Sequence, residues 1–126
     1  MKFVEPSFLI SLFHKKSNRY EKSKKIFNNL KDNDLSISYM VIAEVLTVLR
    51  KLKVKDELVE KAYNSMINMI VIDDTLYYEK SFKACLTNEI GFFDNLYYIL
   101  MKDLGIGEII SYDNDFDIFE DINRIH

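Results

Sequence analysis

The sequence predicts a single α/β domain built on a mainly parallel sheet. Short apolar segments of three or four residues alternate along the chain with longer segments whose apolar residues recur at helical spacing. This alternation is typical of parallel strands joined by right-handed helical crossovers. The length of 126 residues suits one domain with its own core. No linker, internal repeat or low-complexity tract divides the chain, so one domain is expected over residues 1–126.

Each expected element follows from apolar spacing and from residues that begin or end helices. Pro6 suits the first turn of a helix, the polar cluster 31–34 predicts a turn, and Ser36 or Ser38 is expected to cap a helix. Strands are expected at 2–4, 35–38, 70–72, 109–110 and 122–125, and helices at 6–13, 19–31, 41–52, 56–69, 76–86 and 93–104.

The second half of the chain continues the alternation. Residues 70–72 are wholly apolar, as in a buried parallel strand. Asp73 and Asp74 are typical of the N-cap region of the next helix, with a metal role as the alternative. Gly105 and Gly107 are expected to end the last long helix. The buried stripes of two helices are expected to be Val41, Val45, Val48 and Leu52, and Phe93, Tyr97, Leu100 and Leu104.

Composition limits the classes of protein that the chain can represent. Hydrophobic residues make up 48% and charged residues 29% of the chain, which is typical of a soluble globular domain. No apolar run approaches the span of a bilayer, so no membrane association is expected. The single cysteine, Cys85, excludes an internal disulfide and a CxxC zinc site, and this cysteine usage favours a cytoplasmic location.

The net charge of −3 hides an uneven distribution of charge along the chain. Residues 1–55 carry 12 Lys and Arg against 5 Asp and Glu, whereas residues 56–126 carry 5 against 15. Two interpretations of the basic half stay open. One is a solvated helix face, the commoner case for a lone helix, and the other is a surface for a phosphate backbone. The basic side chains concentrate at Lys15, Lys16, Arg19, Lys22, Lys24, Lys25 and Lys31.

Four carboxylates stand out against the apolar patterns. Glu5 and Asp113 each follow a strand, and Asp94 lies beside the apolar stripe in the first turn of a helix. Glu44 projects from the apolar face of its own helix, although a partly exposed place at the edge of the stripe is an equal alternative. Because ligand sites in parallel sheets form beyond the carboxyl ends of the strands, these acids are expected to converge at one edge.

Such a cluster points to a divalent cation. Buried carboxylates are too costly to keep ionised without a partner, and Mg²⁺ or Mn²⁺ takes carboxylate oxygens as ligands. One or two such ions activate water and stabilise the leaving oxygen in phosphodiester hydrolysis. The sequence has no serine-type triad spacing, no GxxxxGK[ST] and no GxGxxG. His14 and His126 are isolated and are expected at the surface.

Three stretches together resemble a known family, the PIN domains, and in particular the VapC-type toxin ribonucleases. They are FVEPSFLISLF, SISYMVIAEVLTVLRK and GFFDNLYYILMKDLGIGEIISYDNDFD. The resemblance implies a three-layer α/β/α fold with a sheet of four to five strands. It implies an Mg²⁺- or Mn²⁺-dependent endoribonuclease, the toxin of a toxin–antitoxin pair, which forms a homodimer and is inhibited by a cognate antitoxin.

The resemblance also implies roles for individual residues. Glu5, Glu44, Asp94 and Asp113 occupy the positions of the family's catalytic and metal-binding acids, and Asp115 matches a further acidic position in the last loop. Ser7 keeps a hydroxyl that is typical of the first motif. Together with the basic surface, the expected RNA contacts are Ser7, Lys15, Lys16 and Arg19.

The chain departs from the family pattern at its first motif. Glu5 stands where Asp is the rule, and Pro6 stands where Thr or Ser is common. Because a Glu reaches one methylene further, we expect metal binding with slow cleavage. The alternative is a catalytically weak or inactive PIN module that acts through RNA or protein binding. A response-regulator-like phosphoacceptor domain is a third possibility, but its acidic pair and late Lys are not evident.

Overall fold

A fully parallel five-stranded sheet forms the centre of the protein in the computed structural model, which describes residues 1–30 and 34–126. The strand order is β3-β2-β1-β4-β5, so β1 lies in the middle between β2 and β4. The α/β fold class and the parallel sheet are therefore confirmed. The strands are β1 (Lys2–Val4), β2 (Leu35–Ser38), β3 (Ile70–Ile72), β4 (Glu108–Ile110) and β5 (Asn123–Ile125).

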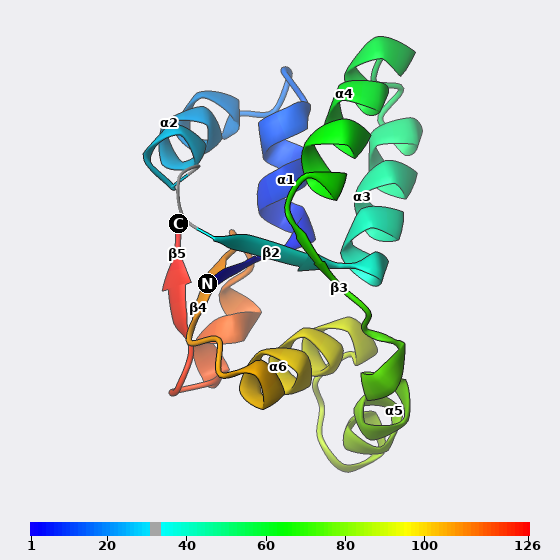
Figure 1. Ribbon diagram of the computed structural model, residues 1–126, viewed down its shortest axis with the longest axis vertical. Helices are drawn as coiled ribbons and strands as arrows, with labels where there is room; N and C mark the ends of the chain where they lie inside the picture. The colour runs from blue at the N-terminus through cyan, green and yellow to red at the C-terminus, as the bar shows by residue number, and fades with distance from the viewer. Residues whose placement is uncertain (31–33) are drawn as a thin grey trace.

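Helices cover both faces of the sheet and give three layers (Figure 1). One face carries α1 (Pro6–Phe13), α2 (Tyr20–Leu30), α3 (Tyr39–Lys51) and α4 (Asp56–Ile67). The other face carries α5 (Tyr78–Thr87) and α6 (Phe92–Leu104). Two 3-10 helices, η1 (Thr75–Tyr77) and η2 (Asn114–Ile118), precede α5 and follow β4. The first three residues of the predicted turn at 31–34, which include the basic residue Lys31, lie outside the described residues.

The core lies where the helices cross the short strands. Phe3 of β1 packs against Tyr97 of α6 with 5.4 Å between ring centroids, and both residues are buried. Ile37 of β2 and Ile109 of β4 are completely buried beside β1. This packing fixes α6 beneath the centre of the sheet. Within the described ranges, no helix is long and apolar enough to cross a membrane.

The predicted apolar stripe of α3 is right in its first half and wrong toward its C-terminal end, and that of α6 is right in its middle and wrong at both ends. In α3, Val41, Val45 and Leu49 are buried, but Leu52 is 44% exposed and Val48 is half-buried. In α6, the ends of the predicted stripe, Phe93 and Leu104, are each 44% exposed. A helix of 13 residues is about 20 Å long, whereas a three-residue strand spans about 10 Å. The helix ends therefore extend past the sheet. The buried face of α6 is Asn95, Leu96, Tyr97, Leu100 and Met101.

Two further expectations about β3 and α3 need correction. β3 is an edge strand rather than a buried one, and Ile70 is 42% exposed. Ser38 occupies the N-cap position of α3, yet its side chain makes no capping hydrogen bond. The cap comes from a distant residue, because the Asp74 carboxylate accepts a hydrogen bond from Met40 N at 2.9 Å. Asp74 is completely buried and also accepts from Tyr78 Oη at 2.9 Å.

Gly105 ends α6, as predicted. Its backbone is left-handed, with φ of 70°, a conformation that glycine adopts at little cost. Ile106 N then donates to Met101 O at 2.8 Å, which closes the last turn of the helix. This termination turns the chain into β4 and so sets where the loop after β4 begins.

Candidate metal centre

The site lies at the edge of the sheet where β1 and β4 end side by side. These strands pair directly, with Val4 opposite Ile110. Glu5 N donates a hydrogen bond to Ile110 O at 3.0 Å, so the two strands are still joined at the point where the chain leaves the sheet. Glu5 follows β1, and Asp113 follows β4 after Ser111 and Tyr112. Two segments more than 100 residues apart therefore bring their carboxylates to one place.

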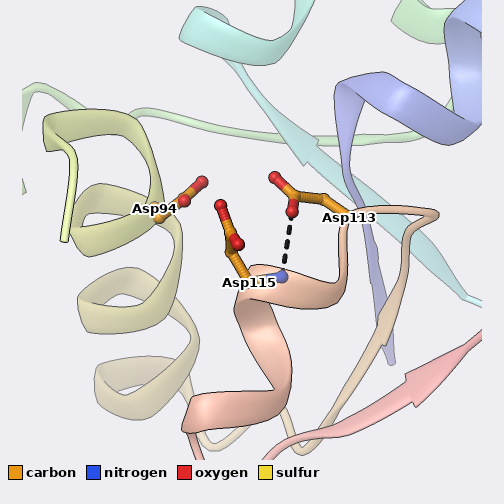
Figure 2. Close-up of side chains that lie close together, drawn as sticks. All are labelled: Asp94, Asp113 and Asp115. Carbon is orange, nitrogen blue, oxygen red and sulfur yellow. Dashed lines mark hydrogen bonds between the residues drawn. The ribbon is translucent and has the colours of Figure 1, made fainter.

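Asp94, Asp113 and Asp115 form a compact group of carboxylates, named here the acidic trio. Each offers a carboxylate oxygen, and the three oxygens lie within 4.8 Å of one another. Figure 2 shows the three side chains pointing toward a common space, Asp94 from α6 and the others from the loop after β4 and the start of η2. Asp113 is the N-cap of η2, and its Oδ1 accepts from Asp115 N at 2.9 Å. This bond fixes the relative positions of the two loop acids.

Glu5 is built into the site by hydrogen bonds. It is the N-cap of α1, and its Oε2 accepts from Ser7 N at 3.1 Å, from Ser7 Oγ, and from Ser111 Oγ at 2.6 Å. Glu5 is only 5% exposed. Burial raises its pKa, the hydrogen bonds from the two serines lower it, and the nearby charge of Asp113 raises it, with a net upward shift. Glu5 thus lies beside the acidic trio as a buried acid with a defined orientation.

Glu44 approaches the same space from the second turn of α3. Its Oε1 accepts a hydrogen bond from Tyr97 Oη at 3.4 Å. Burial is the main cause that raises the pKa of Glu44, and the charge of Asp94 adds to it. Glu44 is half-buried. It therefore projects from the apolar face of α3 and also lies at the edge of that face, so each of the two sequence-based interpretations describes part of its position. Tyr97 connects this acid to the core.

The electrostatics of the site are those of a carboxylate cluster without a compensating cation. Burial raises the pKa of Asp94 to about 6, with further contributions from the charges of Asp113, Glu5 and Asp115. Within the described part of the chain, none of the five acids forms an ion pair. Arg124 is a positively charged side chain near the site, and the charge of Asp113 acts on it. Its guanidinium is occupied by Asp117, at 2.7 and 2.9 Å, and by Ser111 O at 3.2 Å.

This donor set fits a hard divalent cation. Three carboxylate oxygens in reach of one point match the ligand type that Mg²⁺ and Mn²⁺ prefer. Burial is the main cause of the raised pKa of Asp94, and the charges of Asp113, Glu5 and Asp115 raise it further, so a bound cation would relieve part of this cost. The residues that would hold the ion are Asp94, Asp113 and Asp115, and the charges of Glu5 and Glu44 both interact with Asp94.

The residues expected to contact RNA fall in different places. Ser7 lies inside the site, where its Oγ donates to Glu5 and accepts from Tyr112 N at 2.9 Å. Arg19 lies beside the site, because its guanidinium is 4.6 Å from the centre of the Tyr112 ring. Lys15 and Lys16 lie past the far end of α1 and line a separate hollow of about 370 Å³ with Lys53 and Lys55. The structure therefore does not bring these two lysines to the acids.

Three residues that sequence reasoning passed over organise the site. Ser111 Oγ donates to Glu5 and accepts from Asp113 N at 2.9 Å, so it joins β1 to the loop after β4. Tyr112 anchors that loop through Ser23 Oγ at 2.8 Å and through the ring of Phe8 at 5.9 Å. Tyr97 orients Glu44. The available signal for Tyr97 was its position three residues after Asp94 on the same helix, whereas the serine contacts have no signature in sequence spacing.

The chain matches a known protein family and resembles solved structures. The family model described as PIN domain matches residues 2–122. The search of curated proteins returns no match. Among solved structures, VapC20 of Mycobacterium tuberculosis, a Sarcin-Ricin loop cleaving toxin, superposes with a TM-score of 0.82 at 20% identity, covering 94% of each chain.

Two other solved structures share the fold. PAE2754 from Pyrobaculum aerophilum has a TM-score of 0.69 at 15% identity and covers 98% of this chain and 87% of its own. VapBC2 from Rickettsia felis, solved with a DNA fragment from its promoter, has a TM-score of 0.66 at 17% identity and covers 98% and 96%. At these identities the likeness concerns the fold. With a family match over nearly its whole length, the chain belongs to the PIN domain family.

Proposed function

We propose that this PIN domain is a metal-dependent endoribonuclease and the toxin of a toxin–antitoxin pair. The observation that carries the proposal is the acidic trio, flanked by Glu5 and Glu44, at the edge where β1 and β4 end. The superposition with VapC20, a Sarcin-Ricin loop cleaving toxin, supports the toxin assignment. The superposition with VapBC2 supports a VapB-type antitoxin as the partner. A homodimer acting in the cytoplasm is the corresponding expectation for the assembly.

The residues of the site divide the chemistry among them. A bound Mg²⁺ or Mn²⁺ supplies an acidified water and charge stabilisation at a phosphate oxygen. Asp94, Asp113 and Asp115 would hold that ion. Glu44 has a raised pKa and an orienting hydrogen bond from Tyr97, properties that suit it to take a proton at Oε1. Ser7 and Ser111 keep the Glu5 carboxylate in one orientation beside the trio.

The test is cleavage of a labelled RNA pool by the purified protein. We expect cleavage with Mg²⁺ or Mn²⁺, none with EDTA, and loss of cleavage in Asp113→Asn. Asp117→Asn is a matched control, because Asp117 is a nearby acid of η2 that is occupied by Arg124 rather than by the trio. Metal-independent cleavage, or full activity in Asp113→Asn, would show that the acidic trio is not the active centre.

A second candidate is a PIN module with weak or no catalysis, and Glu5 is the observation that favours it. Its Oε2 is engaged by three hydrogen bonds from Ser7 and Ser111. One carboxylate oxygen of the longer Glu5 side chain is therefore already occupied by hydrogen bonds within the protein. Metal-dependent RNA binding without cleavage would select this candidate over the nuclease.

A further inference from the structure

A hollow of about 600 Å³ opens directly beside the acidic trio. Two members of the trio, Asp94 and Asp115, form one side of it. The other walls are the segment 88–91, between α5 and α6, and the exposed side of η2. A phosphate group at the trio would leave the adjoining nucleotide within reach of this space. The hollow is therefore the natural candidate for the part of the RNA next to the scissile bond.

The segment 88–91 is held rigidly by a pair of asparagines. Asn95 is 2% exposed, and its Nδ2 donates to Asn88 Oδ1 at 3.1 Å and to Ile90 O at 2.9 Å. Asn88 Nδ2 returns a bond to Asn95 Oδ1 at 3.0 Å, and Asn88 Oδ1 accepts from Ile90 N at 3.0 Å. The wall is thus formed before any ligand binds. Gly91 faces open space, because a Cβ built there meets no atom within 4 Å.

Two isoleucines give the hollow apolar surface in an otherwise acidic region. Ile118 of η2 is 64% exposed, and Ile90 on the opposite segment is half-buried. A single exposed isoleucine is ordinary on a protein surface. Two that line one hollow, beside three carboxylates, offer apolar contact to a flat ring. Unpaired RNA bases are recognised by such contacts to their faces together with hydrogen bonds to their edges.

The polar side chains of the hollow offer mainly hydrogen-bond acceptors. Glu89 and Asn114 line it and are exposed, and their side chains make no hydrogen bond within the described ranges. Glu89 is a pure acceptor when ionised, and Asn114 offers both an acceptor and donors. A carboxylate accepts hydrogen bonds from the amino groups of bases, as Glu and Asp do from cytosine N4. Adenine, cytosine and guanine each present an exocyclic amino group, whereas uracil presents two carbonyls.

We propose that this hollow is a base-binding subsite that receives an unpaired nucleobase next to the scissile phosphate and discriminates against uracil. The inference rests on the proposed function, because it places the RNA strand over the acidic trio. Ile90 and Ile118 contact the faces of the base, and Glu89 and Asn114 contact its edge. The Asn88–Asn95 pair positions the wall and does not itself contact the base.

The experiment uses the full chain, Mn²⁺ and a randomised single-stranded RNA pool whose cleavage ends are sequenced. The variants are Glu89→Gln and Ile118→Ala. Their matched controls on α4 are Glu60→Gln, at an exposed acid, and Ile67→Ala, which is 44% exposed. We expect the wild type to disfavour uracil at one position beside the cut. Glu89→Gln should reduce that discrimination about tenfold. Ile118→Ala should lower kcat/KM at the favoured sites about tenfold, with Mn²⁺ affinity unchanged.

The controls should keep the wild-type cleavage profile. Identical profiles in the wild type and in both hollow variants would overturn the inference while leaving the nuclease intact. If the wild type cleaves nothing, the proposed function fails. RNA binding then tests whether the subsite exists. In that case, short oligo(C) must bind more tightly than oligo(U) in the presence of Mn²⁺, and Glu89→Gln must remove the difference. Equal affinities for the two oligonucleotides would overturn the subsite as well.

Discussion

Asp94 is the acid of the site whose pKa is raised by three of the other carboxylates. Burial and the nearby Asp113, Glu5 and Asp115 raise its pKa to about 6 in the folded protein, whereas an unfolded Asp has a pKa of about 3.9. The folded protein therefore binds more protons than the unfolded chain between these values. Without metal, the free energy of unfolding should fall as the pH rises from about 4 to about 6 and stay low above that.

Asp94→Asn should remove this pH-dependent loss and abolish cleavage. At pH 7 and in EDTA, the variant should be more stable than the wild type by about 1–2 kcal/mol, allowing for screening by solvent at a half-buried site. Urea unfolding at pH 4 and pH 7 measures the effect. If stability changes equally with pH in the two proteins, the raised pKa of Asp94 is contradicted.

Tyr97 acts on Glu44 through one hydrogen bond, which lowers the pKa of that carboxyl group. Tyr97→Phe keeps the ring in the core and removes the bond. The pKa of Glu44 should then rise further, so the acidic limb of the pH–rate profile should move to higher pH. A lower rate at every pH with no displacement of the limb would indicate a purely structural role for Tyr97. Tyr98→Phe is the matched control, because Tyr98 Oη contacts Asp121 outside the site.

Glu5 is the residue on which we expect the activity of the site to depend most. An Asp is a good N-cap and can accept from Ser7 N, so Glu5→Asp should preserve α1 and change stability by less than about 1 kcal/mol. It should also open space beside the trio and raise the cleavage rate at fixed metal concentration. A lower rate in Glu5→Asp would mean that the longer side chain is an adapted part of the site, held in place by Ser7 and Ser111.

At the scale of the element, α3 depends on a residue from another part of the chain. Asp74 caps its N-terminus through Met40 N, in place of Ser38, whose buried Oγ lacks a hydrogen-bond partner in the described structure. Asp74→Ala should cost about 2–3 kcal/mol, since it leaves buried donors of Met40 and Tyr78 without an acceptor. Asp73→Ala is the control and should cost less, because Asp73 is exposed and bonds to Thr75. Thermal or urea unfolding compares the two variants, and equal losses would contradict the cap.

At the scale of the whole molecule, we expect the basic residues of the first half of the chain to differ in how much each contributes to RNA affinity. Arg19 and Lys22 lie over Tyr112, at 4.6 and 5.7 Å from its ring centre and therefore beside the site. Arg19→Gln with Lys22→Gln should lower the slope of log affinity against log salt by roughly 1.4, at about 0.7 per cation for a single strand. Lys15→Gln with Lys16→Gln should change it less, because those lysines lie past the far end of α1. Equal changes in the two double variants would show that the RNA path covers the whole basic half.

Sequence patterns were sufficient for the overall architecture, because it depends on local spacing. Apolar periodicity located the strands and helices, and Gly105 marked the end of α6 correctly. The same patterns failed where a decision depended on distant partners. No residue near Ser38 indicates that Asp74 caps α3. The burial predicted for 70–72 was wrong because hydrophobic runs also occur in half-covered edge strands.

Four acids of the site could be selected because each stands at a strand end or on an apolar helix face, and Asp115 was added by the resemblance to the family. Their arrangement could not, since it depends on tertiary contacts. The structure groups Asp94, Asp113 and Asp115 and sets Glu5 and Glu44 to the side. The serine bonds that orient Glu5 join residues 106 positions apart in one case. Their roles in catalysis stay predictions until the variants are measured.

The brevity of the two outer strands has a consequence for how copies of the protein can meet. β3 and β5 have three residues each and lie at opposite edges of the sheet. An intruding strand would find few free backbone groups there, so continuous intermolecular sheets gain little from these edges. Resistance to fibril-like aggregation is thus built into the topology. We therefore expect a pair of subunits to meet through side-chain surfaces rather than through a sheet continued across the interface.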